Sequence, residues 1–319
     1  MSANVPKVMR QGKIAPWLYL GPSILIMLVY IVYPTLNTTY LSLRNKDATA
    51  WASTECKSGE SCWGIFENYH QVLTDELNFS SPGELWRSFW ISTYGNNLKW
   101  ILLMVSGSVG GGLIMAVLSD RVKYEALAKA IIFTPMAISF VGAGIIWQFV
   151  YDYGTQDVQI GILNAIRRAL GMQPIAFLQT IPINTIALIM VGVWLWTGFC
   201  MVILSAALKG VPNELLEAAR IDGANEWTVF WRITIPMIMP TITVVITTMV
   251  INTLKVFDIV FVMTGGNYST DVIANRMYTE QYINRHAGRG TAVAVILILA
   301  VLPFIYLNIK RFREQEAIR

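Results

Sequence analysis

Charged residues are scarce in this chain. Asp, Glu, Lys and Arg make up 14% of its 319 residues, against about 25% in soluble domains, whereas hydrophobic residues account for 55%. A chain of this composition cannot cover its own surface with polar groups, so lipid must solvate part of that surface. The basic residues also form no contiguous stripe, which argues against nucleic acid as a partner.

The sequence lacks the motifs of the common catalytic and cofactor sites. It contains no G-x-x-x-x-G-K-[ST] phosphate loop, no nucleophile elbow and no dinucleotide fingerprint. Its two histidines, His70 and His286, have no ligand-like partners in the sequence pattern. We therefore predict that the chain is not an enzyme and has no metal site and no cofactor. Any ATP that drives it must be hydrolysed by a separate subunit.

Cysteine is rare as well, with three in the chain. Cys56 and Cys62 lie close together in a polar stretch, and Cys200 lies in an apolar run. Their spacing fits neither a zinc site nor a thioredoxin-like pair. A disulfide between Cys56 and Cys62 is one interpretation and two free thiols is the other, because spacing alone does not fix side-chain geometry.

Long apolar runs, in contrast, are abundant. A helix that crosses a bilayer needs about 20 mostly apolar residues, because its backbone groups must pair within the helix. The first run is too long for a signal peptide and has no small-residue cleavage site after it, so we interpret it as a retained span. The sequence predicts an all-α integral membrane protein with six transmembrane helices, at 17–43, 97–118, 130–151, 184–208, 236–263 and 291–309.

The distribution of lysine and arginine predicts the orientation. Of the 24 basic residues, 13 lie in four segments that are together shorter than the remaining connections, namely 1–16, 119–129, 209–235 and 310–319. Because cytoplasmic segments carry the excess of positive charge, we expect both termini on the cytoplasmic side of the inner membrane. The connections 44–96, 152–183 and 264–290 then lie outside, where a disulfide is chemically permitted.

The connection between the fourth and fifth predicted spans, 209–235, carries the most distinctive pattern. Pro212 and Asn213 favour a helix start, and acidic residues follow in the first turn. Gly223 is expected to end this helix, and a second short helix is expected from Glu226 to Arg232. From composition alone, this helix–turn–helix either lies in the lipid interface or fills a groove on a soluble partner.

Its residue spacing resembles a known motif. Glu217, Ala218 and Ala219 are followed after three residues by Gly223, and after nine more by Ile-Thr-Ile-Pro at 233–236. This resembles the EAA loop of binding-protein-dependent ABC importer permeases, whose pattern is EAA, then G, then I-x-L-P. The chain departs from that pattern only in having Ile235 at the leucine position, which is an apolar exchange.

The resemblance implies a role for each of these residues. In that family the loop docks on the ATPase subunit and transmits its motion to the pore helices. Glu217 would be the polar anchor, Ala218 and Ala219 the close-packing surface, and Gly223 the turn. The family also implies three partners: a dimer of ABC ATPase subunits, a second permease subunit in a heterodimer, and an extracytoplasmic solute-binding protein.

Further phrases resemble the maltose-type sugar permeases, and among them the permeases for α-glucosides and glucosylglycerol. The resemblance implies transport of such a sugar or glycoside by alternating access. The phrases are Phe-Thr-Pro-Met at 133–136, Met-Ala-Ile-Ser-Phe-Val-Gly-Ala at 136–143, Ile-Gly-Ile-Leu-Asn-Ala at 160–165, Val-Ile-Leu-Ser-Ala-Ala-Leu at 202–208, Lys-Val-Phe-Asp at 255–258 and Met-Thr-Gly-Gly at 263–266.

Candidate substrate contacts are polar and aromatic residues inside the predicted spans, since both kinds must face a water-filled cavity to bind a sugar. Asn252, Lys255 and Asp258 are the main candidates, with Trp194 and Thr197 as weaker ones. Lys255 and Asp258 are three residues apart, so on one continuous helix they would share a face. They then either contact substrate or form an ion pair that braces the bundle.

Two alternative functions remain open at this point. The same scaffold would suit another cargo, such as glycerol phosphate or a polyol. An ion-coupled secondary transporter or channel would instead use Lys255 and Asp258 as its coupling site. The EAA spacing argues against this second alternative.

Overall fold

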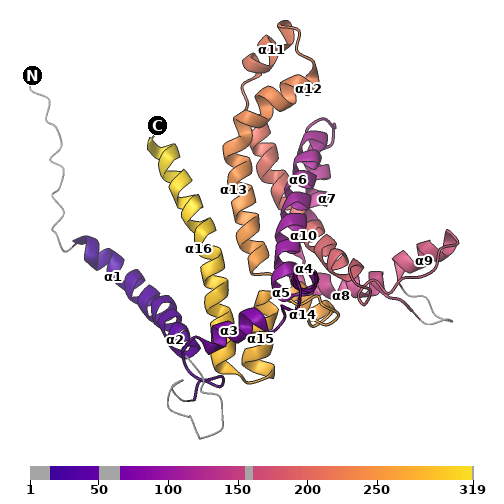
Figure 1. The fold of residues 1–319 in the computed structure, drawn as a ribbon. Coiled ribbons are helices and arrows are strands. Elements are labelled where there is room, and N and C mark those ends of the chain that lie inside the picture. The colour runs from indigo at the N-terminus through magenta and orange to yellow at the C-terminus, as the bar shows by residue number, and fades with distance from the viewer. Residues whose placement is uncertain (1–14, 50–64, 155–160, 318–319) are drawn as a thin grey trace, which may run out of the picture.

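A computed structural model describes residues 15–49, 65–154 and 161–317, and every regular element in these ranges is a helix (Figure 1). The all-α prediction is thereby confirmed. Cys56 and Cys62 lie outside the described residues, so the disulfide between them stays a prediction.

Five helical stretches are long and apolar enough to cross a membrane, and a bent helix pair gives a sixth. Three of the five contain a π-helical segment, labelled η. The stretches are α1 (Ala15–Met27), η1 (Leu28–Val32) and α2 (Tyr33–Ser42); α5 (Thr93–Lys99), η2 (Trp100–Val105) and α6 (Ser106–Ser119); α10 (Ile183–Lys209); α12 (Glu226–Val229), η4 (Phe230–Thr234) and α13 (Ile235–Leu254); and α16 (Ala287–Ala317).

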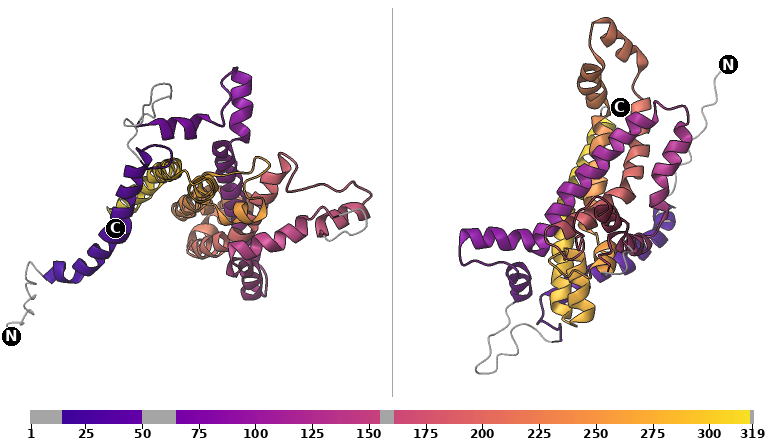
Figure 2. Two further views of the ribbon diagram at one scale, coloured as in Figure 1. Left: turned by 90° about the horizontal axis from the view of Figure 1, so that it is seen from below. Right: turned by 90° about the vertical axis from the view of Figure 1, so that its right-hand side faces the viewer.

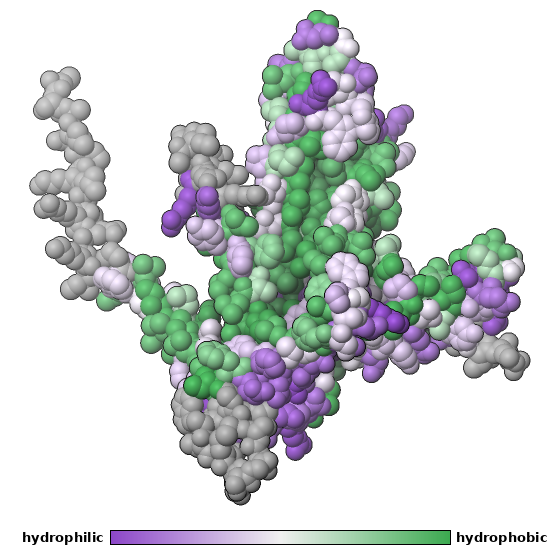
Figure 3. Space-filling model, in the orientation of Figure 1, coloured by the Kyte–Doolittle hydropathy of each residue, from purple (hydrophilic) through white to green (hydrophobic). Residues whose placement is uncertain are grey.

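The two ends of the bundle are formed by different helices. At one end the chain forms α11 (Asn213–Ile221) and α12, and we call this the loop end. The opposite end, the cap, holds α3 (Glu67–Thr74), α4 (Pro82–Ile91), α15 (Ile273–Tyr278) and η5 (Thr279–Ile283). Apolar residues cover the region between the two ends, and hydrophilic residues gather at both (Figure 3). This is the distribution expected of a protein that spans a bilayer.

The third predicted span, 130–151, is not one straight helix. It consists of α7 (Glu125–Phe133), a short 3₁₀ turn η3 (Thr134–Ala137) and α8 (Phe140–Tyr151), with a 98° bend between the two halves. Pro135 has no backbone N–H to continue the helix. Ser139 then starts α8 as its N-cap, and its hydroxyl accepts a hydrogen bond from the Gly142 N–H at 3.0 Å.

The fifth predicted span, 236–263, is also wrong in extent. The helix already begins at Glu226 on the loop side and ends at Leu254. A separate helix, α14, then runs from Asp258 to Met263. Lys255 follows the C-terminus of α13 and Asp258 opens α14, so each charge complements the dipole of its own helix end. The expected shared helical face of these two residues does not exist.

The core lies where α6 and α10 pack closely against each other. A Cβ atom added to Gly112 would lie 2.5 Å from Cys200 Cβ and 2.8 Å from the Met201 backbone nitrogen. Gly107 likewise faces Val193 of α10. Gly107 and Gly112 therefore serve helix packing, which is the usual role of small residues in membrane bundles.

Outside this core, two parts extend to opposite sides. The stretch α1–η1–α2 lies on one side and packs mainly on α16 through α2, and α9 (Ile162–Ala169) extends on the other (Figures 1 and 2). None of the apolar window of the first span is buried in the chain. Its surface is therefore available to lipid or to another subunit.

Ion pairs hold the cap to the spans. Arg276 of α15 pairs with Glu76, and Arg289 of α16 pairs with Asp75. Glu76 also accepts a hydrogen bond at 2.6 Å from the backbone N–H of Thr93, in the first turn of α5. The segment after α3 is thus connected to α5, α15 and α16, and the outer ends of these helices are fixed relative to one another.

At the loop end, a charged cluster joins α7 to α10. The Lys129 ammonium lies 2.6 Å from carboxylate oxygens of both Asp120 and Glu125 and also donates to the Ser205 hydroxyl. Ser205 donates to Asp120 at 2.8 Å, and Lys209 pairs with Glu125. The cluster fixes the last turn of α10 just before the chain enters α11.

We expect Gly112→Ala to destabilise the protein. The added methyl group would meet the α10 backbone, which cannot move aside without separating the helices, at a cost of about 1–3 kcal/mol. Gly110→Ala is the control, because nothing lies within 4 Å of a Cβ there. Thermal unfolding of the detergent-purified protein should show a lower midpoint for Gly112→Ala alone. Equal midpoints for the two variants would contradict the close helix contact.

Lys129→Met should also lower stability, because it leaves Asp120 without a cation and Glu125 with Lys209 alone. The Lys129 side chain is 19% exposed, so solvent screens these pairs only in part. Lys123→Met is the matched control, since Lys123 is exposed in the same connection. The measurement is the unfolding midpoint at low and high salt. A midpoint for Lys129→Met that equals the control would show that the cluster adds nothing.

Candidate functional site

The loop that carries the sequence motif is closed by a defined helix-ending turn. Gly223 has φ +87°, a left-handed conformation that glycine adopts without steric cost. Its N–H donates to the Arg220 carbonyl at 3.1 Å, and the Ala224 N–H donates to the Ala219 carbonyl at 3.0 Å. This pair of bonds is a Schellman motif. Gly223 therefore ends α11 as the sequence predicts.

The start and the exit of the loop differ from the sequence expectation. Asn213 lies inside the first turn of α11, and no side-chain bond caps that helix. At the exit, Asn225 caps α12 by accepting from the Thr228 N–H at 2.8 Å. The helix expected from Glu226 to Arg232 does not end there but continues through η4 into α13. The second half of the loop is therefore part of the fifth span.

A salt bridge connects the two halves of the loop. The Arg220 guanidinium donates to both Glu226 carboxylate oxygens, at 2.7 and 3.3 Å. Both side chains are exposed, so the pair orients α11 on α12 and adds little stability.

The motif residues divide between two faces of α11. Glu217 and Ala218 are exposed, whereas Ala219 is buried in the chain itself. Of the two alanines expected to contact a partner, only Ala218 is thus available, and Ala219 packs within the loop. Ile221 lies four residues after Glu217 and three residues after Ala218, so it shares their exposed face.

Several large apolar side chains are also exposed at this end, and two of them, Ile221 and Trp231, were not expected from the sequence. Ile221 is 86% exposed and Trp227 is 72% exposed, and Leu215 and Trp231 are also exposed. The sequence spacing could have shown that Ile221 joins the face of Glu217 and Ala218, because it lies four and three residues after them. Leu215 and Ile221 lie between the fourth and fifth spans, and exposed apolar residues there are typical of a surface that binds another protein.

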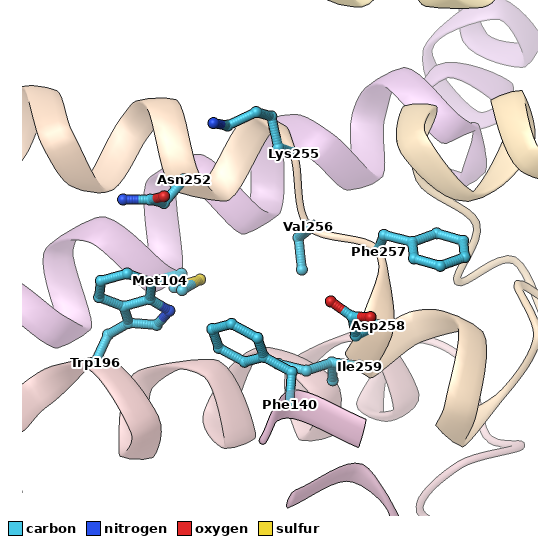
Figure 4. A pocket seen from close by; sticks show the side chains of 9 residues that line it. All are labelled: Met104, Phe140, Trp196, Asn252, Lys255, Val256, Phe257, Asp258 and Ile259. Atoms are coloured by element: carbon cyan, nitrogen blue, oxygen red, sulfur yellow. The ribbon is translucent and has the colours of Figure 1, made fainter. Parts of the chain in front are cut away.

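A second site lies where the two broken spans meet near the cap. Figure 4 shows a pocket of about 130 Å³ lined by Met104, Phe140, Trp196, Asn252 and residues 255–259. Phe140 is the first residue of α8, directly after one break, and residues 255–257 form the other break. Irregular backbone at membrane depth is tolerated where it is buried or lines a cavity. Both breaks therefore contribute residues to this pocket.

The structure brings three of the five predicted substrate residues to this pocket, namely Asn252, Lys255 and Asp258. The Asn252 amide donates to the Thr248 carbonyl at 3.0 Å, which leaves its oxygen free to accept. Within the described residues, no ion pair joins Lys255 to Asp258, and the two side chains point in different directions (Figure 4). The bracing ion pair considered from the sequence is therefore wrong.

The other two predicted residues lie elsewhere. Trp194 packs edge-to-face on Trp147, with ring centroids 5.6 Å apart, and belongs to the aromatic contacts of the core. The Thr197 hydroxyl donates to the Val193 carbonyl of its own helix at 2.6 Å. Neither residue lines the pocket.

The aromatic side of the pocket comes from Phe140 and Trp196, which are not among these five residues. The rings of Phe140 and Trp196 stack with centroids 6.2 Å apart and an angle of 23° between their planes. Their spacing in the chain gives no signal, because the contact depends on the bend before α8. At about 130 Å³ the pocket is smaller than a typical ligand site of several hundred Å³, so a complete site requires a larger opening or a second subunit.

Comparisons with known proteins agree with this architecture. Residues 108–316 match the family described as binding-protein-dependent transport system inner membrane component. The chain is 49% identical to the osmoprotective compounds uptake permease protein of Synechocystis sp., over 95% of this chain and 100% of that one. It is 43% identical to the alpha-glucoside transport system permease protein of Rhizobium meliloti, over 96% and 84% of the two chains.

A solved structure has the same fold. It is the crystal structure of a bacterial ABC transporter involved in the import of the acidic polysaccharide alginate, with a TM-score of 0.71 at 20% sequence identity. The match covers 94% of this chain and 95% of that one. The chain therefore belongs to the family of binding-protein-dependent transport system inner membrane components, the membrane permeases of ABC importers.

Proposed function

We propose that this chain forms half of the pore of an ABC importer for an α-glucoside or a small glucosylated osmolyte such as glucosylglycerol. The cargo is inferred from the two most similar relatives described above, one named for osmoprotective compounds and the other for alpha-glucosides. Other cargo, such as glycerol phosphate or a polyol, is less well supported. Membership of the family argues against an ion-coupled transporter.

One geometric observation carries the mechanism. The helix that begins at Glu226 in the loop runs unbroken to Leu254, next to the pocket. Its 29 residues correspond to roughly 40 Å at about 1.5 Å per residue. A displacement of α11 and α12 therefore moves the start of this helix. Because the helix is continuous, the movement reaches its other end, which carries Asn252 and the break at 255–257.

The partners follow from the two ends of this helix. The exposed face of Glu217, Ala218 and Ile221 is proposed to dock on an ATPase subunit on the cytoplasmic side, which places both termini there as well. The pocket on the opposite side is proposed to be completed by a second permease subunit and filled from a solute-binding protein. Closure of the ATPase dimer would then reorient the pocket from the outside to the cytoplasm.

Reversal of the motif charge tests the coupling role. Glu217→Lys places a cation at the proposed docking face and should reduce ATP-driven transport by roughly tenfold or more, since a lost interface contact of about 1.4 kcal/mol has that effect. Asp222→Lys is the matched control: it makes the same charge reversal on an exposed residue outside the motif. The measurement is uptake and ATP hydrolysis by the complete importer in proteoliposomes. Equal loss in both variants would contradict a specific role for Glu217.

The pocket is tested by removal of its amide. Asn252→Leu should lower the transport rate at saturating binding protein by about fivefold, because a buried hydrogen bond to a sugar hydroxyl is worth about 1 kcal/mol. Thr197→Val, which changes a residue outside the pocket, should leave the rate unchanged. Measured uptake of radiolabelled α-glucoside separates the two. A defect in Thr197→Val without one in Asn252→Leu would move the sugar site away from this pocket.

A further inference from the structure

The short helix α9 exposes apolar residues and buries a polar one. Its apolar residues Ile162 and Ile166, together with Leu170 directly after it, are 59%, 51% and 67% exposed. They are spaced four residues apart, so they lie along one side of the helix. In water such a side would be the first to be covered by the rest of the chain.

On the opposite side of α9, in contrast, Asn164 is covered by the chain itself. Asn164 is fully buried, and its amide donates to the carbonyls of Asp152 and Ile175, both at 2.9 Å. Its oxygen accepts from the Ile175 N–H at 2.9 Å. Asn164 lies about 160° around the helix from Ile166 at 100° per residue. These three bonds fix the rotation of α9 and hold its apolar side outward.

The position of α9 explains what this side faces. Because α8 is bent by 98° from α7, the chain leaves the bundle sideways near the cap, and α9 lies at the far end of this arm (Figures 1 and 2). The exposed apolar residues Ile145, Ile146 and Phe149 of α8 precede it. Figure 3 shows apolar residues continuing along the arm, with hydrophilic residues towards its tip.

The charges of α9 fit a bilayer surface. Arg167 and Arg168 occupy the last turn, about 100° and about 160° around the helix from Ile166. The Arg167 Nε–H donates to the Gln173 carbonyl at 2.9 Å, whereas Arg168 is exposed. A helix with an apolar side and exposed arginine on the other is the pattern of an interfacial membrane helix, and its cation attracts anionic headgroups.

We propose that α9 is an interfacial anchor that rests its Ile162–Ile166–Leu170 side in the membrane leaflet nearest the cap, with Arg168 at the phosphates of anionic lipids. The anchor holds the outer end of α8, whose first residue lines the pocket. The inference goes beyond the proposed cargo and coupling, because it requires only that the chain is a membrane permease.

Spin labels on two sides of α9 test the proposal. Cys56→Ser and Cys62→Ser remove the two cysteines outside the described residues, and Cys200 is buried. A label at Ile166→Cys is compared with one at Arg168→Cys, in the complete importer in phosphatidylcholine–phosphatidylglycerol vesicles. Oxygen partitions into lipid, whereas a nickel chelate stays in water. The ratio of spin relaxation by oxygen to relaxation by the chelate should be several-fold larger at position 166 than at position 168.

Each other outcome overturns the proposal. If the nickel chelate reaches both labels equally, the apolar side of α9 lies in water. If neither reagent reaches position 166, protein covers it, and the partner is the second permease subunit. Neither measurement depends on transport. The anchor proposal can therefore be overturned while the proposed function stands.

The anionic lipid is tested separately. Replacing phosphatidylglycerol with phosphatidylcholine should make the label at position 166 more accessible to the nickel chelate, and Arg168→Gln should remove this dependence on lipid. Arg87→Gln, an exposed arginine of α4, is the control and should leave it intact. An unchanged lipid dependence in Arg168→Gln would show that Arg168 does not hold the headgroups.

Discussion

Inside a bilayer, a backbone amide that leaves its helix finds no water to bond to, and this constraint organises the whole permease. A break in a span is costly unless protein or a polar cavity surrounds it. The chain has two such breaks, one at Pro135–Ser139 and one at Lys255–Phe257, and both end beside the same pocket. The interrupted helices therefore place non-helical backbone groups beside the pocket, where a polar cargo can bind them.

The same constraint favours a rigid connection between the pocket and the loop. Because the fifth span has no break between Glu226 and Leu254, it can move as one body. The Schellman turn at Gly223 and the Arg220–Glu226 salt bridge orient α11 on the start of that helix. The Lys129 cluster fixes the end of α10 on the other side of the loop. The loop is thus held at both ends, and its exposed face is left for a partner.

Much of this architecture could be predicted from the sequence. Hydropathy gave the number of spans, and the spacing from Glu217 to Gly223 gave the loop and its turn, since both depend on local residue properties. The sequence did not reveal the bend at η3, because the run 130–151 is apolar throughout and Pro135 alone does not specify an angle. The side chains of Phe140 and Trp196 meet only after that bend. Lys255 and Asp258 were assigned to one helical face because periodicity assumes a continuous helix.

The contact between α2 and α16 has a consequence for biosynthesis. The first span emerges from the ribosome long before its main neighbour, which is the last helix of the chain. Until then its apolar surface has only lipid or other proteins to contact, as independently stable membrane helices allow. The long sequence separation makes this pairing a late step of folding. Truncation before α16 would leave an inserted but unpaired first helix, which quality-control proteases of the membrane can recognise.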